Sequence, residues 1–161
     1  MAYYGIDPIN FESVSAVTST NSVDLGTLRW DSGELYEYVY AVGTISVGVG
    51  GVYSGTSGHS VVATGAVTGE ACAGFCKHVA LASGKYGWLL KKGVVDAKNA
   101  RASTAPSVNQ PAYLGSDGGI VTDTSVVTSA IDCGHVIGKV LSAGASGGTG
   151  SSLSLLLVAV L

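Results

Sequence analysis

The chain has 161 residues, the size of a single domain with a core of its own. Hydrophobic residues make up 47% of it and charged residues 12%, a composition that excludes global disorder. The formal net charge of -3 provides no basic surface for a phosphate backbone, so we expect no nucleic-acid partner. Because so few side chains are charged, much of the surface must be neutral, and we expect an oligomer.

Glycine is unusually frequent, with 24 residues against 3 prolines, among many Val, Thr, Ser and Ala residues. This mixture is typical of short strands that are separated by tight turns. No segment shows a period of 3.6 over the length of a helix. The sequence therefore predicts an all-β fold, a small glycine-rich β-barrel or sandwich of about 8–10 short strands.

Residues 1–25 have no clear period and predict an extended arm that lies on its own surface or on a partner's. The candidates for partner contact in this arm are Tyr3, Tyr4, Ile6 and Phe11. The arm has neither the basic start nor the apolar run of a signal peptide, so we expect the protein to be made in a cytoplasm. The β-barrel domain is predicted to span residues 26–161.

Two alternating runs in residues 28–40 flank the turn-forming segment 31–34 and predict a hairpin. Aromatic side chains at period two suit a buried strand face. The predicted core aromatics are Trp30, Tyr36, Tyr38, Tyr40, Tyr86 and Trp88. Further on, residues 43–58 predict strand structure that turns at Gly50 and Gly51.

Residues 71–92 are the most strand-like part of the sequence, with a turn predicted at residues 83–85. The alternating run that follows this turn ends in Lys91 and Lys92, which predict a strand edge.

The last third of the chain predicts a loop at residues 99–109 and a hairpin about Asp117 and Gly118. Residues 125–130 are compatible with one helical turn. Two final strands are predicted within 135–141 and 153–161. The second run has about nine residues, which is too short for a membrane helix, and it predicts a buried strand.

Motifs of catalysis are missing from the sequence. It contains no Gly-x-Ser-x-Gly nucleophile elbow, P-loop, dinucleotide fingerprint or calcium loop. His59 lies in a glycine-rich turn, which predicts an exposed loop histidine. The carboxylates of Asp31, Asp117 and Asp123 fall in turns and are predicted to be turn formers. We therefore expect no enzymatic activity and no cofactor.

One constellation has the residue types of a zinc site. Its candidate ligands are Cys72, Cys76, His78, Cys133 and His135. A Cys-x-His pair on a strand points both side chains to one face, and two such strands could hold the metal. However, the spacing from Cys72 to Cys76 is not that of a tight Cys-x-x-Cys knuckle, and a disulfide is not expected without an export signal. Free buried thiols are the expectation, with a zinc-stabilised β domain as an alternative.

Two segments carry a resemblance to a known family. They are GELYEYVY at residues 33–40 and GKYGWLLKKG at residues 84–93. With the glycine-turned strands around them, they resemble the head decoration (cement) proteins of tailed bacteriophages. The resemblance covers about residues 26–161, outside the arm.

The resemblance implies a non-enzymatic protein of the virion, without active-site residues. Such proteins, often homotrimers, bind the outside of the capsid where major capsid protein subunits meet, and they hold the expanded shell together. A second interpretation is a virion fibre or adhesin module, because exposed Tyr and Trp side chains on glycine-rich loops can stack on host glycans.

Overall fold

The computed structural model describes residues 13–54, 58–63, 71–98, 106–115, 119–121, 136–142 and 152–157. Within these ranges the chain forms ten strands and no helix, which confirms the all-β prediction. The strands are β1 (Leu28–Asp31), β2 (Glu34–Ala41), β3 (Gly50–Tyr53), β4 (Ser60–Ala63), β5 (Cys72–Phe75), β6 (Tyr86–Lys98), β7 (Pro111–Leu114), β8 (Ile120–Val121), β9 (Gly138–Val140) and β10 (Ser152–Leu157). No helix in this part of the chain could cross a membrane.

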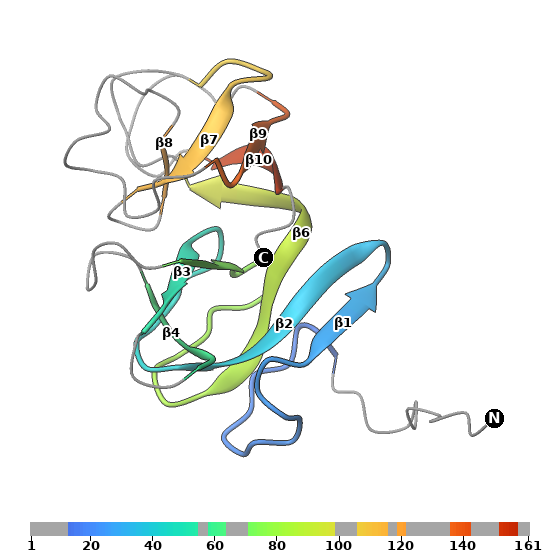
Figure 1. The fold of residues 1–161 in the computed structure, drawn as a ribbon, viewed down its shortest axis with the longest axis vertical. Coiled ribbons are helices and arrows are strands. Elements are labelled where there is room, and N and C mark those ends of the chain that lie inside the picture. Colours follow the sequence, from blue (N-terminus) through green and yellow to red (C-terminus); the bar gives the residue numbers. More distant parts are fainter. Residues whose placement is uncertain are drawn as a thin grey trace.

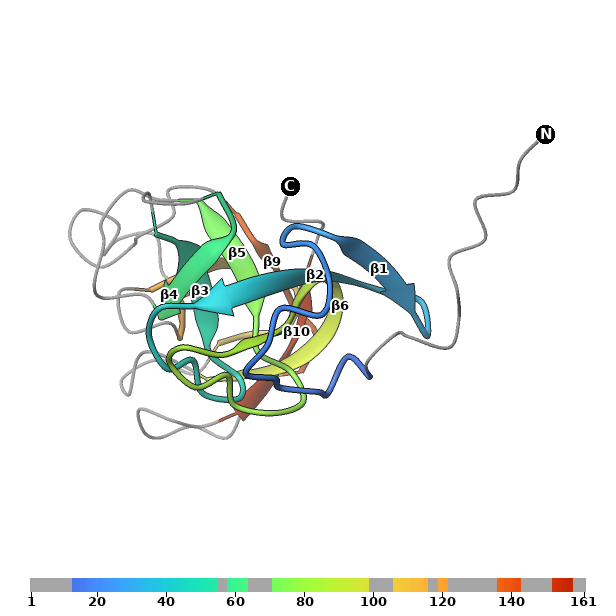
Figure 2. The same cartoon turned by 90° about the horizontal axis from the view of Figure 1, so that it is seen from below.

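Five strands close into a small barrel in the order β2-β4-β3-β5-β6, with β6 pairing back to β2 (Figure 1, Figure 2). The pairing of β2 with β4 is parallel, and the other four pairings of the barrel are antiparallel. Strand β1 extends the barrel sheet at its outer edge, where it pairs with β2. The closed ring is the type of all-β fold that the glycine-rich sequence predicts.

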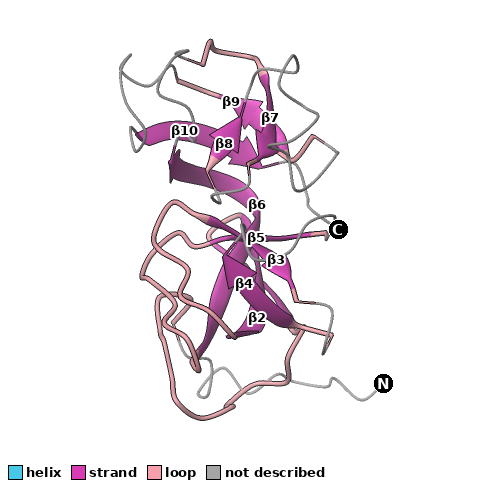
Figure 3. Ribbon diagram, turned by 90° about the vertical axis from the view of Figure 1, so that its left-hand side faces the viewer, coloured by secondary structure: helices cyan, strands magenta, loops and turns pink. Residues whose placement is uncertain are grey.

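A second sheet continues from the same long strand. The last residues of β6 pair with β10, and β9, β7 and β8 follow in that order. Figure 3 shows the barrel and this second sheet as two layers that share β6. Gly93 lies where β6 passes from one layer to the other, and its φ of 141° is one that L side chains rarely adopt. A side chain at this position would also meet the Glu34 carboxylate.

Strand β6 corrects the prediction that Lys91 and Lys92 mark a strand edge. The strand runs on to Lys98 and has pairing partners on both sides, so it is central. Lys92 is exposed, but Lys91 is only 3% exposed. The local pattern was wrong because a buried acidic partner on β2 compensates the charge of Lys91.

The predicted first hairpin is confirmed. Trp30 pairs with Leu35 and Asp31 with Glu34, so a two-residue turn joins β1 and β2. Both turn residues, Ser32 and Gly33, have positive φ angles of 52° and 84°, as a type I′ turn requires.

The turn predicted at Gly50 and Gly51 is wrong, because both glycines lie within β3. Neighbouring side chains explain why these positions lack side chains of their own. A Cβ on Gly50 would lie 2.5 Å from Leu114 and 3.0 Å from Phe75, and one on Gly51 would lie 3.0 Å from Ile45. The glycine pair therefore allows close packing rather than a turn.

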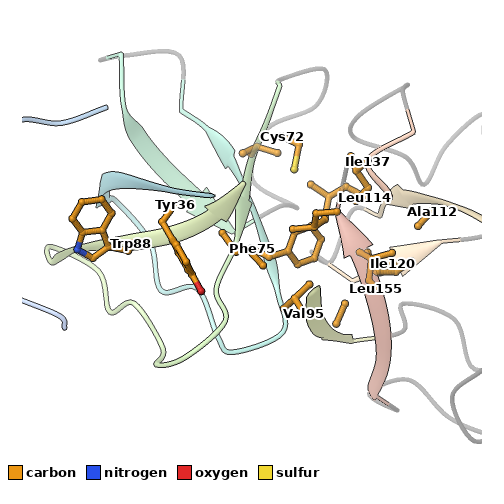
Figure 4. Close-up of a cluster of buried hydrophobic side chains, with 14 of the residues drawn as sticks. Tyr36, Cys72, Phe75, Trp88, Val95, Ala112, Leu114, Ile120, Ile137 and Leu155 are labelled. Atoms are coloured by element: carbon orange, nitrogen blue, oxygen red, sulfur yellow. The ribbon is translucent and has the colours of Figure 1, made fainter. Parts of the chain in front are cut away.

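Two hydrophobic clusters form on opposite faces of the barrel strands. The inner core fills the barrel and consists of Val39, Ala41, Ile45, Val49, Val61, Ala73, Cys76, Leu81 and Leu89. The outer core includes Phe75 and Leu90 of the barrel with Leu114, Ile137 and Leu155 from the second sheet. In Figure 4, Phe75 lies against Leu114, while Tyr36 and Trp88 are at the far end of the cluster. The outer core thus holds the two sheets together.

The predicted core aromatics divide into three groups. Tyr36, Tyr38 and Trp88 are buried, whereas Tyr40 and Tyr86 are half-buried. Trp30 is 61% exposed, so its prediction as a core residue is wrong. It lies on the edge strand β1, where most of its ring remains exposed.

Residues 13–25 lie on the barrel. Thr18 pairs with Tyr86 through two backbone hydrogen bonds of 3.0 Å, and Ser22 contacts the Tyr38 hydroxyl at 3.2 Å. Val14, Val23 and Leu25 pack on the outer core. The candidate contact residues Tyr3, Tyr4, Ile6 and Phe11 lie outside the described residues, as does the segment predicted to form a helical turn.

Candidate functional site

The predicted zinc ligands do not converge in the described part of the chain. Cys72 belongs to the outer core and Cys76 to the inner core, and neither is in a disulfide. Among the described residues, no group of three or more His, Cys, Asp or Glu side chains could hold a metal ion. Cys133 and His135 lie outside the described residues.

Cys76 has the properties of a packed thiol. Its Sγ donates a hydrogen bond to the carbonyl of Val79 at 2.7 Å. Burial raises the pKa of the thiol to about 11, which keeps the sulfur protonated at neutral pH.

A polar cluster closes one end of the barrel. This barrel-mouth cluster consists of Glu37 on β2, Tyr53 on β3, His59 just before β4, and Lys91 on β6. Tyr53 donates to one carboxylate oxygen of Glu37 at 2.6 Å, and Lys91 lies 3.0 Å from the same oxygen. His59 Nδ1 lies 2.7 Å from the other oxygen, and Lys91 also donates to the Tyr53 hydroxyl at 2.9 Å. One carboxylate thus joins four barrel elements.

The electrostatics of the cluster depend on these contacts. Burial by itself raises the pKa of Glu37, but the hydrogen bond from Tyr53, the positive charge of Lys91 and the contact with His59 outweigh it. The pKa of Glu37 is therefore lowered, and the carboxylate stays charged at neutral pH. Burial and the neighbouring carboxylate raise the pKa of Tyr53, so this hydroxyl stays protonated.

His59 is more than an exposed loop histidine, which corrects the sequence-based interpretation. Its side chain is 43% exposed, yet one ring nitrogen is bound to the buried carboxylate. The ring also lies against the backbone of Gly26, which has a φ of 82° and no room for a side chain. His59 therefore joins the start of β4 to the segment that leads into β1.

A second polar cluster forms around Glu34, which precedes Glu37 by three residues on β2. This flank cluster consists of Glu34, Tyr36, Lys77 and His78. Lys77 contacts both oxygens of Glu34, at 2.7 and 2.6 Å, and Tyr36 donates to Glu34 at 2.7 Å. The Tyr36 hydroxyl also lies 3.0 Å from His78 Nε2.

The flank cluster is less buried than the barrel mouth. The side chain of Glu34 is 18% exposed and that of Lys77 is 26% exposed, against 4% for both Glu37 and Lys91. Partial burial raises the pKa of Glu34, but the contacts with Lys77, Tyr36 and the backbone N–H of Val94 lower this pKa by a larger amount. The net pKa of Glu34 is lowered.

Each cluster borders a shallow depression. The one at the barrel mouth has a volume of about 220 Å³ and is lined by Gly26, Leu28, Glu37, Tyr53, His59 and Lys91. The one at the flank has a volume of about 300 Å³ and is lined by Val47, Lys77, His78, Val94 and Asp96. The hydrogen bonds and ion pairs above join both carboxylates to lysine and tyrosine side chains, and Glu37 also to a histidine, so both clusters cross-link separate segments of the barrel.

Sequence reasoning missed the barrel-mouth cluster. The alternation of β2 places the tyrosines on one face, which predicts a solvated position for Glu37 on the other. A signal was present nevertheless, because Glu37 lies between Leu35 and Val39, and Lys91 follows Leu89 on the same face of its strand. One acid and one base, each in an otherwise apolar row, can bury together.

Comparison with known proteins gives one informative similarity. No family model matches the chain, and no curated protein matches it. A solved structure does, the crystal structure of the head fiber gp8.5 N base in bacteriophage phi29. At 12% sequence identity the match has a TM-score of 0.50 and covers 78% of this chain and 96% of that chain. Most of the chain is thus similar in fold to this head fiber base.

Proposed function

We propose that this chain is a non-enzymatic structural protein of a bacteriophage virion. In this proposal it binds the outside of the capsid at junctions between major capsid protein subunits and stabilises the expanded shell. The observation that carries the proposal is the fold shared with the phi29 head fiber base, since the match extends over nearly all of that chain.

The two family-like segments support the same assignment. GELYEYVY covers the last turn residue of the first hairpin and nearly all of β2. GKYGWLLKKG covers the end of the turn before β6 and the first half of β6. The two strands pair with each other, and Tyr36, Tyr38 and Trp88 on them are buried. The resemblance therefore rests on residues that build the barrel, which suits a structural role rather than catalysis.

The polar residues also favour a structural role. Proton transfer requires a side chain with free access to a substrate. Glu37 and Glu34 instead accept hydrogen bonds from lysine and tyrosine side chains of their own barrel. Their paired state suits a protein that must remain folded under mechanical load.

In this proposal the partners are the major capsid protein and further copies of the chain, as a homotrimer. Several modest contacts give strong binding when one oligomer touches several shell subunits at once. Residues 13–25 of the predicted arm pack on the barrel, so the proposed contact segment is its first part, with Tyr3, Tyr4, Ile6 and Phe11.

A second candidate function is attachment within a virion fibre. The matched structure is described as the base of a head fiber, which favours a module that carries a further fibre or adhesin. Trp30 is an exposed ring, and such rings can stack on sugars.

Cryo-electron microscopy of expanded shells of the parent virus, mixed with the purified chain, tests the proposal. Density at subunit junctions supports the cement function and reports the number of copies at each site. Bare shells contradict it. A glycan array with the same preparation tests the second candidate, and a blank array counts against it.

A further inference from the structure

Strand β1 has an outer edge that no other strand of the described ranges pairs with. It is the last strand on its side of the sheet and pairs only with β2 (Figure 1, Figure 2). The N–H of Tyr38 donates to the carbonyl of Thr27, and hydrogen-bonded pairs alternate along an antiparallel ladder. The backbone groups of Arg29 therefore face β2, whereas those of Leu28 and Trp30 face outward. No described strand pairs with this outward side.

The side chains on this edge are unusually apolar for an exposed position. Leu28 is 53% exposed and Trp30 is 61% exposed, and they share one face at a spacing of two. The ammonium of Lys92 lies 5.6 Å from the centre of the Trp30 ring and helps to hold it in place. Proteins normally protect such an edge, because its free backbone groups attract another strand.

We propose that this edge binds a second copy of the chain, β1 against β1, as an antiparallel pair about a two-fold axis. In this pair Trp30 lies opposite Trp30 of the second copy. The sheet of one barrel then continues into the sheet of the other.

The charges on β1 select this register. Outward backbone groups must pair with outward groups, so Leu28 or Trp30 of one copy meets Leu28 or Trp30 of the other. Placing Leu28 opposite Trp30 puts Arg29 opposite Arg29, and like charges directly opposite are destabilising. Placing Leu28 opposite Leu28 leaves Trp30 opposite Gly26. Placing Trp30 opposite Trp30 puts Arg29 opposite Asp31 twice, with both rings in contact.

The same two side chains already lie close within one chain. Arg29 Nη2 is 3.8 Å from Asp31 Oδ2, and both side chains are partly exposed, at 24% and 35%. Two copies in this register would join them into a ring of four alternating charges. The contact uses only residues of this chain and is independent of the virion assignment.

The interface is small, because each copy contributes a four-residue strand. Interfaces well below about 1,000 Å² are usually transient. Such a contact becomes effective where copies are held close together. On a shell it would join separate oligomers pairwise, which a three-fold contact within a trimer does not do.

The test uses two charge variants of the full chain. Arg29→Asp makes both positions acidic, and Asp31→Arg makes both basic. Each variant alone should self-associate about tenfold more weakly or worse than the wild type, because the facing charges repel. A mixture of the two should recover a complex with one copy of each, because acidic and basic strands face each other.

Sedimentation velocity over a range of concentrations measures the association, and native mass spectrometry identifies the mixed species. Lys139→Asp, an exposed charge change on β9, is the matched control and should associate like the wild type. Recovery in the mixture also proves that neither variant failed to fold.

Three results would overturn the proposal: a wild-type average mass that does not rise with concentration, single variants that associate as well as the wild type, or no recovery in the mixture. Trp30→Lys adds a further test. If it abolishes shell binding and leaves self-association unchanged, the occupant of the edge is the shell and not a second copy.

Discussion

The two polar clusters on β2 contain the same four residue types and differ in burial. In each, a glutamate contacts a lysine and a tyrosine, and the histidine contacts the glutamate at the barrel mouth and the tyrosine on the flank. At the barrel mouth, Glu37 and Lys91 are almost completely buried, whereas Glu34 and Lys77 on the flank remain partly hydrated. Because the two clusters contain the same residue types, removing the lysine from each and comparing the losses in unfolding free energy should report how much burial adds to the cost of an unpaired carboxylate.

The largest effect is expected for Lys91→Met. This change leaves the Glu37 carboxylate buried without its cation, so the free energy of unfolding should fall by about 3–5 kcal/mol. Lys77→Met is the matched control on the flank, where about 0–1 kcal/mol is expected because water replaces the lysine. Urea denaturation measures both values. Equal losses would remove the distinction between the clusters.

The tyrosines give a smaller contrast. Tyr53→Phe removes a hydroxyl that donates to Glu37 and accepts from Lys91, which should cost about 1–3 kcal/mol of unfolding free energy. Tyr36→Phe should cost about 0.5–1.5 kcal/mol, since its partners reach solvent. Thermal melts of the two variants side by side test the order, and the reverse order would contradict it.

Acid should weaken both clusters. The pKa values of Glu34 and Glu37 are lowered from the ordinary value of 4.5, so the unfolded chain takes up protons at a higher pH than the folded chain. The stability that these groups contribute is complete above that value and is lost as the pH falls through the lowered folded pKa.

Glu37→Gln removes one of these titrations and should flatten the acid limb of a plot of stability against pH. Glu34→Gln is the matched variant on the flank. Chemical denaturation between pH 3 and pH 7 measures the slopes. An acid limb that neither variant changes would show that other groups cause the acid sensitivity.

The smallest effect concerns the closed interior behind the barrel mouth. With a pKa of about 11, the Cys76 thiol should be about a thousandth ionised at pH 8 and should react slowly with iodoacetamide. Peptide mass spectrometry of the labelled protein gives the rate at this cysteine. Lys91→Met should speed the labelling if the barrel mouth controls access to the interior.

Much of the fold could be predicted from local patterns. The first hairpin followed from a turn-forming pair between alternating runs, and the pairing of Tyr113 and Leu114 with β8 followed from a similar pattern. These features depend on neighbours in sequence, so composition and period suffice to find them. Trp30 shows the limit, because the pattern identifies a strand but not whether another element covers it.

The barrel-mouth cluster could not be predicted in the same way. Glu37 and Lys91 are far apart in sequence, and they lie beside each other only because β6 pairs back to β2 and closes the barrel. Gly50 likewise predicts a turn from its local sequence, whereas in the structure it lies in a strand and makes room for Leu114 and Phe75. Contacts between distant segments decided these roles.

The sequence by itself determined the all-β class, the first hairpin and the pattern of short strands separated by glycine-rich turns. These properties come from turn chemistry and from a period of two, which act over a few residues. Only the tertiary structure decided which charges are buried, which tryptophan is exposed and which strand edge is open. Burial and edges depend on ring closure and on the packing of two sheets, and no local stretch of sequence contains that information.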